Sequence, residues 1–154
     1  MAKKIIKFDN SSELDFLLAG IVCPYKDYRL CFEINRALKL SFARKEDHTL
    51  YLGKPGAEAA FSFYKAINRF GEEFYVLGNK SIQATLIPEK PAFDFFMIVK
   101  NYGAYFDFNE ICNKIKQIEM VSAVSQLRVE ELKSADNFIF DWLCNILIKL
   151  KLLP

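Results

Sequence analysis

Metal-binding and nucleophilic residues are scarce in this sequence of 154 residues. It contains one histidine, His48, and its four cysteines form no C-x-x-C pair. A zinc site combines several His and Cys ligands at short spacings, so the sequence predicts no metal and no cofactor. His48 follows Asp47 in a polar stretch without further catalytic partners, which predicts a solvated loop residue. The cysteines are predicted to be reduced, buried thiols: Cys23, Cys31, Cys112 and Cys144.

An excess of one charge and long apolar runs are also lacking. The net charge is +2 with 26% charged residues, and no basic stripe marks a nucleic-acid surface, so no nucleic-acid partner is predicted. Asp9, Glu13 and Asp15 interrupt the apolar N-terminal stretch, which argues against a secretion signal. No run is long and apolar enough for a transmembrane segment. These features predict a cytoplasmic protein.

Apolar and aromatic residues are abundant instead. Hydrophobic residues make up 52% of the chain and aromatic residues 15%, which predicts a packed core. A chain of this length buries roughly two thirds of the surface that its unfolded form exposes. No repeat or linker interrupts the sequence, so residues 1–154 are predicted to form a single domain.

The first part of the chain predicts a short strand over residues 4–8 and then an N-terminal helical pair. Residues 12–22 repeat aliphatic side chains at helical spacing after a serine cap. A second helix is predicted over residues 26–38, after Pro24. For the first helix a strand remains an open alternative, because apolar character also alternates at Phe16, Leu18 and Gly20.

The middle of the chain predicts a largely antiparallel sheet of five to six strands. The extended segments are residues 41–44, 49–52, 59–70, 74–77, 85–87, 93–99 and 121–129. Asp107 and Glu110 form a capping box for a helix over residues 108–118. The order of these segments predicts one strand–helix–strand crossover of right hand. Together with a C-terminal helix, they make the predicted fold class α+β.

Residues 138–154 are nearly all apolar, and their polar residues recur every four positions. This pattern predicts a helix with a narrow polar stripe, which must be buried in its own domain, in a partner or at a membrane surface. Two interpretations are open: a helix that closes the sheet of its own domain, and self-association. The candidate interface residues are Trp142, Leu143, Ile146, Leu147 and Leu150.

Two separated segments carry a family resemblance. IPEKPAFDF (residues 87–95) resembles the signature of a small bacterial family named after it, the IPExxxVDY proteins. KDYRLCFEIN (residues 26–35) is similar to that family's other recurrent segment. The resemblance covers roughly residues 16–140 and implies no activity. Phe93 and Phe95 replace the usual Val and Tyr, so a mechanism that used the tyrosine hydroxyl would be lost here.

Polar residues of these two segments form the candidate site. Paired carboxylates act as general acid and base when their surroundings separate their pKa values. If the helical segment packs against the turn at Pro88, an arginine would join them in a pocket for a small cation or a zwitterion. The structural alternative assigns the same residues to ion pairs, turn caps and backbone hydrogen bonds. The candidates are Asp27, Arg29, Asn35, Glu89 and Asp94.

Two functional hypotheses follow. The first is a small cytosolic, non-catalytic binding or scaffold protein, with an unknown protein partner or with self-association through the C-terminal helix. The alternative is a small enzyme or ligand sensor that uses the carboxylates Glu89 and Asp94 with Arg29. The sequence has no nucleophile–base pair and no phosphate-binding loop, which favours the first hypothesis.

Overall fold

The computed structural model describes residues 14–53 and 56–139. The strand predicted over residues 4–8 lies outside these ranges. So does the predicted C-terminal helix beyond residue 139, with the candidate interface Trp142, Leu143, Ile146, Leu147 and Leu150. Within the described ranges no helix has the length and apolar character needed to cross a membrane.

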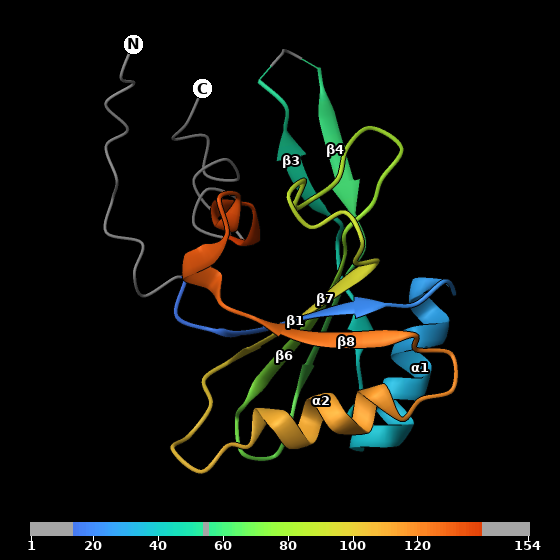
Figure 1. Cartoon of the computed structure of the whole chain (residues 1–154), viewed down its shortest axis with the longest axis vertical. Coiled ribbons are helices and arrows are strands. Elements are labelled where there is room, and N and C mark those ends of the chain that lie inside the picture. Colours follow the sequence, from blue (N-terminus) through green and yellow to red (C-terminus); the bar gives the residue numbers. More distant parts are fainter. Residues whose placement is uncertain (1–13, 54–55, 140–154) are drawn as a thin grey trace.

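A six-stranded antiparallel sheet forms the centre of the fold (Figure 1). Its spatial order is β2-β5-β6-β7-β1-β8. The strands are β1 Leu17–Val22, β2 Ala43–Arg44, β5 Phe63–Ile67, β6 Glu73–Gly78, β7 Phe95–Lys100 and β8 Ala123–Leu127. A second sheet pairs β3 (His48–Tyr51) with β4 (Glu58–Phe61) and extends away from the first. With two helices, these strands confirm the predicted α+β class. The segment predicted as extended over residues 59–70 forms two strands, β4 and β5, in different sheets.

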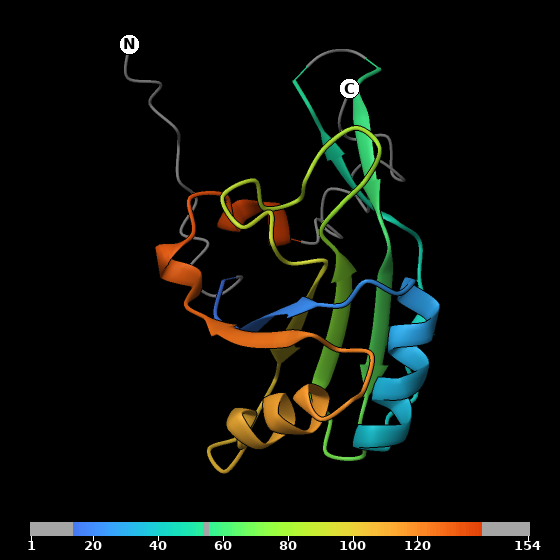
Figure 2. The same ribbon diagram turned by 45° about the vertical axis from the view of Figure 1, so that its right-hand side comes forward.

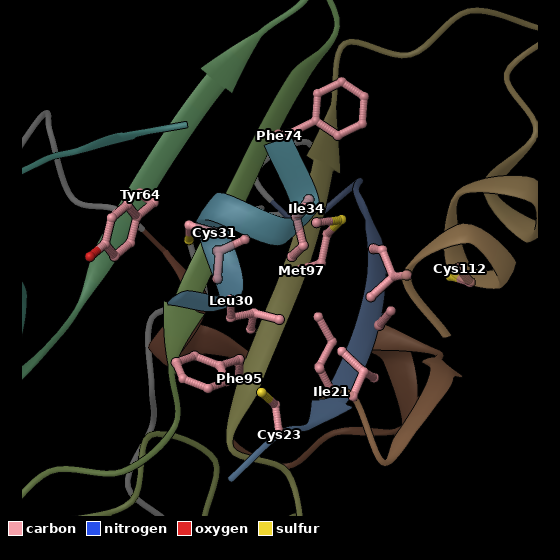
Figure 3. Packing of buried hydrophobic residues seen from close by; sticks show 14 of the residues in the cluster. Ile21, Cys23, Leu30, Cys31, Ile34, Tyr64, Phe74, Phe95, Met97 and Cys112 are labelled. Atoms are coloured by element: carbon pink, nitrogen blue, oxygen red, sulfur yellow. The ribbon is translucent and has the colours of Figure 1, made fainter. Parts of the chain in front are cut away.

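Helices α1 (Asp27–Leu38) and α2 (Phe108–Lys116) cover one face of the main sheet (Figure 2). Helix α1 buries Leu30, Cys31 and Ile34 in a core that also contains Ile21 of β1 and Met97 of β7 (Figure 3). The spacing of these three residues places them on one side of the helix. The sequence therefore predicted this helix correctly from its apolar period.

The opposite face of the sheet is covered by shorter elements. They are the β3–β4 hairpin, the loop between β6 and β7, and the 3-10 helices η2 (Val129–Glu131) and η3 (Ala135–Phe138). Strand β7 is thus buried on both sides, with Met97 and Val99 facing the helices and Phe96 and Ile98 facing the other layer. This explains why β7 is a continuous apolar run instead of an alternating one.

The predicted strand–helix–strand crossover is present. Strands β7 and β8 both pair antiparallel with β1, which lies between them, so they run in the same direction with α2 in their connection. Asp107 caps α2 by accepting a hydrogen bond from the Glu110 N–H at 3.2 Å. The Glu110 carboxylate pairs with Lys114 at 3.1 Å, so the Asp107 half of the predicted capping box is the one that forms.

The helix predicted over residues 12–22 is wrong, and with it the N-terminal helical pair, whereas the alternative of a strand is confirmed over residues 17–22. Residues 17–22 form β1, which pairs with β7 on one side and β8 on the other. Leu18 faces one core and Ala19 the opposite one, as the period of two in a strand requires. Both faces of β1 are apolar because both faces of the sheet are covered, and a run of this kind also fits a helical repeat.

Candidate functional site

The loop between β6 and β7, residues 79–94 and here called the motif loop, contains most of the segment that resembles the family signature. The strand predicted over residues 85–87 is reduced to one bridge between Lys80 and Thr85. Leu86 and Ile87 are instead fully buried loop residues in the core opposite the helices. The apolar part of the motif therefore has a packing role.

Asn79 fixes the shape of the motif loop from inside. Its side chain is fully buried, and its Nδ2 donates to the backbone carbonyls of Lys90 at 2.9 Å and Phe93 at 2.8 Å. Its Oδ1 accepts from the Ile87 N–H at 2.9 Å. A buried amide that meets three backbone groups replaces the water those groups would otherwise need. Asn79 is not among the candidates from the sequence, because these partners lie 8 to 14 residues along the chain.

Glu89 ties the motif loop to the C-terminal side of the described chain. Its Oε1 accepts from the Ser134 N–H at 2.8 Å, and its Oε2 accepts from Ser134 Oγ at 2.9 Å, directly before η3. Burial opposes ionisation of Glu89, but the hydrogen bonds from Ser134, together with the Glu89 backbone and the charge of Lys133, lower the pKa of this carboxyl. A general acid needs a raised pKa, so this environment suits a structural carboxylate better.

Asp94 closes the other end of the motif loop. Its Oδ2 accepts from the Cys23 N–H at 2.8 Å, and its Oδ1 pairs with Lys80 Nζ at 3.0 Å. The preceding residue, Phe93, lies with its ring over Gly20 of β1, where a Cβ atom would come within 2.5 Å of the ring. Asp94 thereby links the start of β7 to the end of β1.

The three candidates of the helical segment also have contacts within the fold. Asp27 pairs with Arg44 at 3.0 Å, and Asn35 Oδ1 accepts from the Phe42 N–H at 2.8 Å just after α1. Arg29 lies over the ring of Tyr25, 4.8 Å from its centroid. The structural role foreseen for Asn35 is confirmed by this bond.

Two of the five candidates line one common cavity. A hollow of about 310 Å³ lies where β1 and β6 end and β7 begins, and Asp27, Asp94, Lys26 and Lys80 are among its lining residues. Arg29, Asn35 and Glu89 do not line it. The two carboxylates therefore share a concave surface with two ammonium groups, without the arginine of the predicted pocket.

The thiols of the described chain are buried and unpaired, as predicted. Burial raises the pKa of Cys31 to about 12 and that of Cys112 to about 11. Burial is also the largest cause of the raised pKa of Cys23. Because the thiolate is the reactive form, none of the three is suited to act as a nucleophile at neutral pH. The fourth predicted thiol, Cys144, lies outside the described residues.

The prediction that His48 is a solvated loop residue is wrong. It begins β3, is half-buried, and its Nε2 lies 2.7 Å from the backbone carbonyl of Asn137 in η3. Burial lowers the pKa of His48, although the contact with Asn137 opposes this shift. The Asn137 side chain donates to the Leu86 carbonyl at 2.7 Å. His48 and the motif loop are thus joined through one residue of η3.

The side of α1 that faces away from the sheet carries aromatic and arginine side chains where solvated charges are usual. Tyr28 and Phe32 are each 59% exposed, and Tyr25, just before the helix, is 44% exposed. Arg29 lies over the Tyr25 ring and Arg36 over the Phe32 ring, at 4.8 and 5.9 Å. These five residues are here called the outer face of α1. The sequence did carry a signal for it, since Tyr28 and Phe32 are four residues apart and opposite the buried positions.

No protein-family model matches the chain, and no curated protein is similar to it. Among residues 14–53 and 56–139, no group of three His, Cys, Asp or Glu side chains is placed to hold a metal ion. The geometry of the described residues is thus the basis for a functional proposal.

Proposed function

We propose that this protein is a small cytosolic, non-catalytic binding protein that holds a protein partner on the outer face of α1. The observation that carries the proposal is the exposed pair Tyr28 and Phe32, with Arg29 and Arg36 beside them. Tyrosine and arginine are enriched among residues that dominate binding energy, and aromatic residues are enriched in interfaces generally.

A rigid support favours binding at this face. Leu30, Cys31 and Ile34 anchor the other side of α1 in the core, so the helix needs no ordering when a partner arrives. The cation–π contacts also limit the freedom of the aromatic rings. Less conformational entropy is then lost on association, which raises affinity for a given contact area.

The surroundings of the polar candidates support a non-catalytic role. Glu89 and Asn35 accept hydrogen bonds from backbone N–H groups, and Asp94 does the same while pairing with Lys80. Such bonds hold segments in place and favour the ionised carboxylate. These bonds give all three residues a structural role, as expected for a non-catalytic protein.

A capture experiment with matched variants tests the proposal. The tagged full chain and its Tyr28→Ser/Phe32→Ser variant are each incubated with a lysate of cells in which the protein occurs. The control is Phe70→Ser, because Phe70 is 72% exposed and lies under Arg69 in the turn between β5 and β6. We expect a partner that the wild type and the Phe70 variant retain and the α1 variant loses.

Two outcomes would contradict this role for the outer face of α1. One is a partner that binds all three proteins equally, which would place its site elsewhere on the chain. The other is recovery of only a second copy of the chain, unaffected by the α1 substitutions. That result would favour self-association, which is one of the two interpretations of the C-terminal segment. Circular dichroism of each variant checks that the substitutions leave the fold intact.

A second candidate function is supported by the cavity at the start of β7. Asp27 and Asp94 line it together with Lys26 and Lys80, so it offers both charges to a small zwitterion. Native mass spectrometry of gently purified chain tests this candidate. A bound small molecule that is lost in an Asp94→Asn variant would support a ligand-binding role, and a bare chain in both preparations would oppose it.

A further inference from the structure

The charges around the outer face of α1 are unevenly distributed. The exposed charged residues from Pro24 to Lys39 are all basic: Lys26, Arg29, Arg36 and Lys39. The two carboxylates of the same stretch, Asp27 and Glu33, are half-buried. Each of them already has a cationic partner, Arg44 for Asp27 at 3.0 Å and Arg36 for Glu33 at 3.6 Å. The solvent side of the helix is therefore positive.

Arg29 is available to a partner. Its guanidinium contacts the Tyr25 ring, and it forms no ion pair with any residue in the described part of the chain. Arg36 lies seven residues further, two helical turns or about 10 Å along the axis, with Phe32 between them. A partner that covers Phe32 would thus meet an arginine on each side.

We infer, on the basis of the proposed function, that the partner presents an acidic protein segment with an apolar side chain between two carboxylates. The apolar side chain would cover Phe32 and Tyr28. The carboxylates would reach Arg29 and Arg36, whose planar guanidinium groups bind carboxylates through two parallel hydrogen bonds. Spacing of the two carboxylates by about 10 Å follows from the spacing of the arginines along α1.

Single-stranded nucleic acid is the competing ligand, because it also stacks on aromatic rings beside arginines. The low net charge of the chain opposes it. The net charge of the whole chain is only +2, far from the basic surface of nucleic-acid-binding proteins. A protein segment with one apolar anchor is the better match.

Selection from a library of random 12-residue peptides displayed on phage tests the inference, with the full chain as the immobilised target. We expect the enriched peptides to carry at least two acidic residues around an aromatic or aliphatic one. A synthetic peptide of the most enriched sequence should bind at least about tenfold more weakly to an Arg29→Glu/Arg36→Glu variant. Binding should also weaken when salt rises, because exposed charge pairs are screened.

Arg69→Glu is the matched control, because Arg69 makes the same kind of contact with the exposed ring of Phe70, at 4.9 Å. It should bind the peptide as the wild type does. Enrichment of neutral or basic peptides, no enrichment at all, or equal losses in both charge variants would overturn the inference. So would a 20-residue oligothymidine that binds with similar affinity and loses it in the Arg29→Glu/Arg36→Glu variant.

These failures are distinguishable from failure of the proposed function. If the captured partner still depends on Tyr28 and Phe32 while the enriched peptides lack acidic residues, the outer face of α1 binds a partner but the inference of an acidic segment is wrong. If neither capture nor peptide binding depends on the outer face of α1, both proposals fall together.

Discussion

Removal of the Asn79 side chain should destabilise the protein more than loss of other hydrogen-bonded polar side chains of the fold. In Asn79→Ala, three backbone groups lose their partner: the Ile87 N–H and the carbonyls of Lys90 and Phe93. The Ile87 N–H lies in a buried bond, so water does not easily replace the lost acceptor. An unsatisfied buried group costs roughly 1–3 kcal/mol.

The magnitude follows from these three groups. We assign about 2 kcal/mol to the Ile87 N–H and about 1 kcal/mol to each carbonyl, since the two carbonyl bonds are less buried. The expected loss in the free energy of unfolding is therefore about 4 kcal/mol. For a domain of this size, that corresponds to a fall in Tm of about 8–16 °C. It would remove a large part of the 5–15 kcal/mol that typically separates folded from unfolded chains.

This loss in the free energy of unfolding is measured by urea denaturation, with circular dichroism as the readout. Asn35→Ala is the control, because Asn35 makes one such bond, to the Phe42 N–H, and should cost only about 1 kcal/mol. Hydrogen exchange should show lost protection of the Ile87 amide in the Asn79 variant. If Asn79→Ala costs no more than Asn35→Ala, water or loop rearrangement satisfies the three groups, and the role assigned to Asn79 is wrong.

Three further predictions concern the contacts around the motif loop. Gly20→Ala should destabilise the chain by about 1–3 kcal/mol, because its Cβ would lie 2.5 Å from the Phe93 ring. The double variant Gly20→Ala/Phe93→Val should recover most of that loss. If the losses in free energy of unfolding of the two single variants simply add in the double variant, no clash between residues 20 and 93 is present. The pKa of Glu89 is lowered, so its stabilising effect is complete above its ordinary value near 4.5 and is lost as the pH falls through the folded value. Glu89→Gln should therefore be less stable than the wild type by about 1 kcal/mol at neutral pH. Its free energy of unfolding should fall less than that of the wild type when the solution is acidified, whereas parallel pH profiles of the two proteins would contradict this account. His48 is the only histidine of the sequence, so its titration by NMR is unambiguous and should have a midpoint below pH 6.5. The stability of the protein should decline as the pH falls through 6.5, because the unfolded chain then binds a proton more readily. A midpoint at or above 6.5 would contradict the burial of His48.

The sequence predicted those elements whose apolar pattern has one explanation. Helix α2 has a period near 3.6 and a cap at Asp107, and β6 and β7 are compact apolar runs between turns. The run over residues 17–22 has two explanations, because a strand covered on both faces and a buried helix are both apolar throughout. What decided between them was the pairing of β1 with β7 and β8, which lie more than 70 residues away in the sequence.

The candidate site was predictable only in part, for a related reason. Local sequence indicated which residues are polar within the motif, but their partners are distant: Glu89 meets Ser134, and His48 meets Asn137. A side chain whose partner is 45 or 89 residues away has no local pattern to reveal it. Asn79 was missed for a similar reason, although fewer residues separate it from its partners. An asparagine in a turn ordinarily bonds to its immediate neighbours in the sequence, so bonds to more distant residues are not expected.

The two segments that resemble the family signature thus have different roles in the protein. In the motif loop, the side chain of Asn79 bonds to the loop's own backbone, and the carboxylates of Glu89 and Asp94 bond to Ser134 and Cys23, so these polar residues have a role in folding. The helical segment has a buried half that folding explains and an exposed half that it does not. A helix needs no aromatic residue on its solvent side, and exposed Tyr28 and Phe32 forgo the solvation that charged residues would gain there. The exposed half of α1 is therefore a part of the described chain whose residues a binding partner would explain.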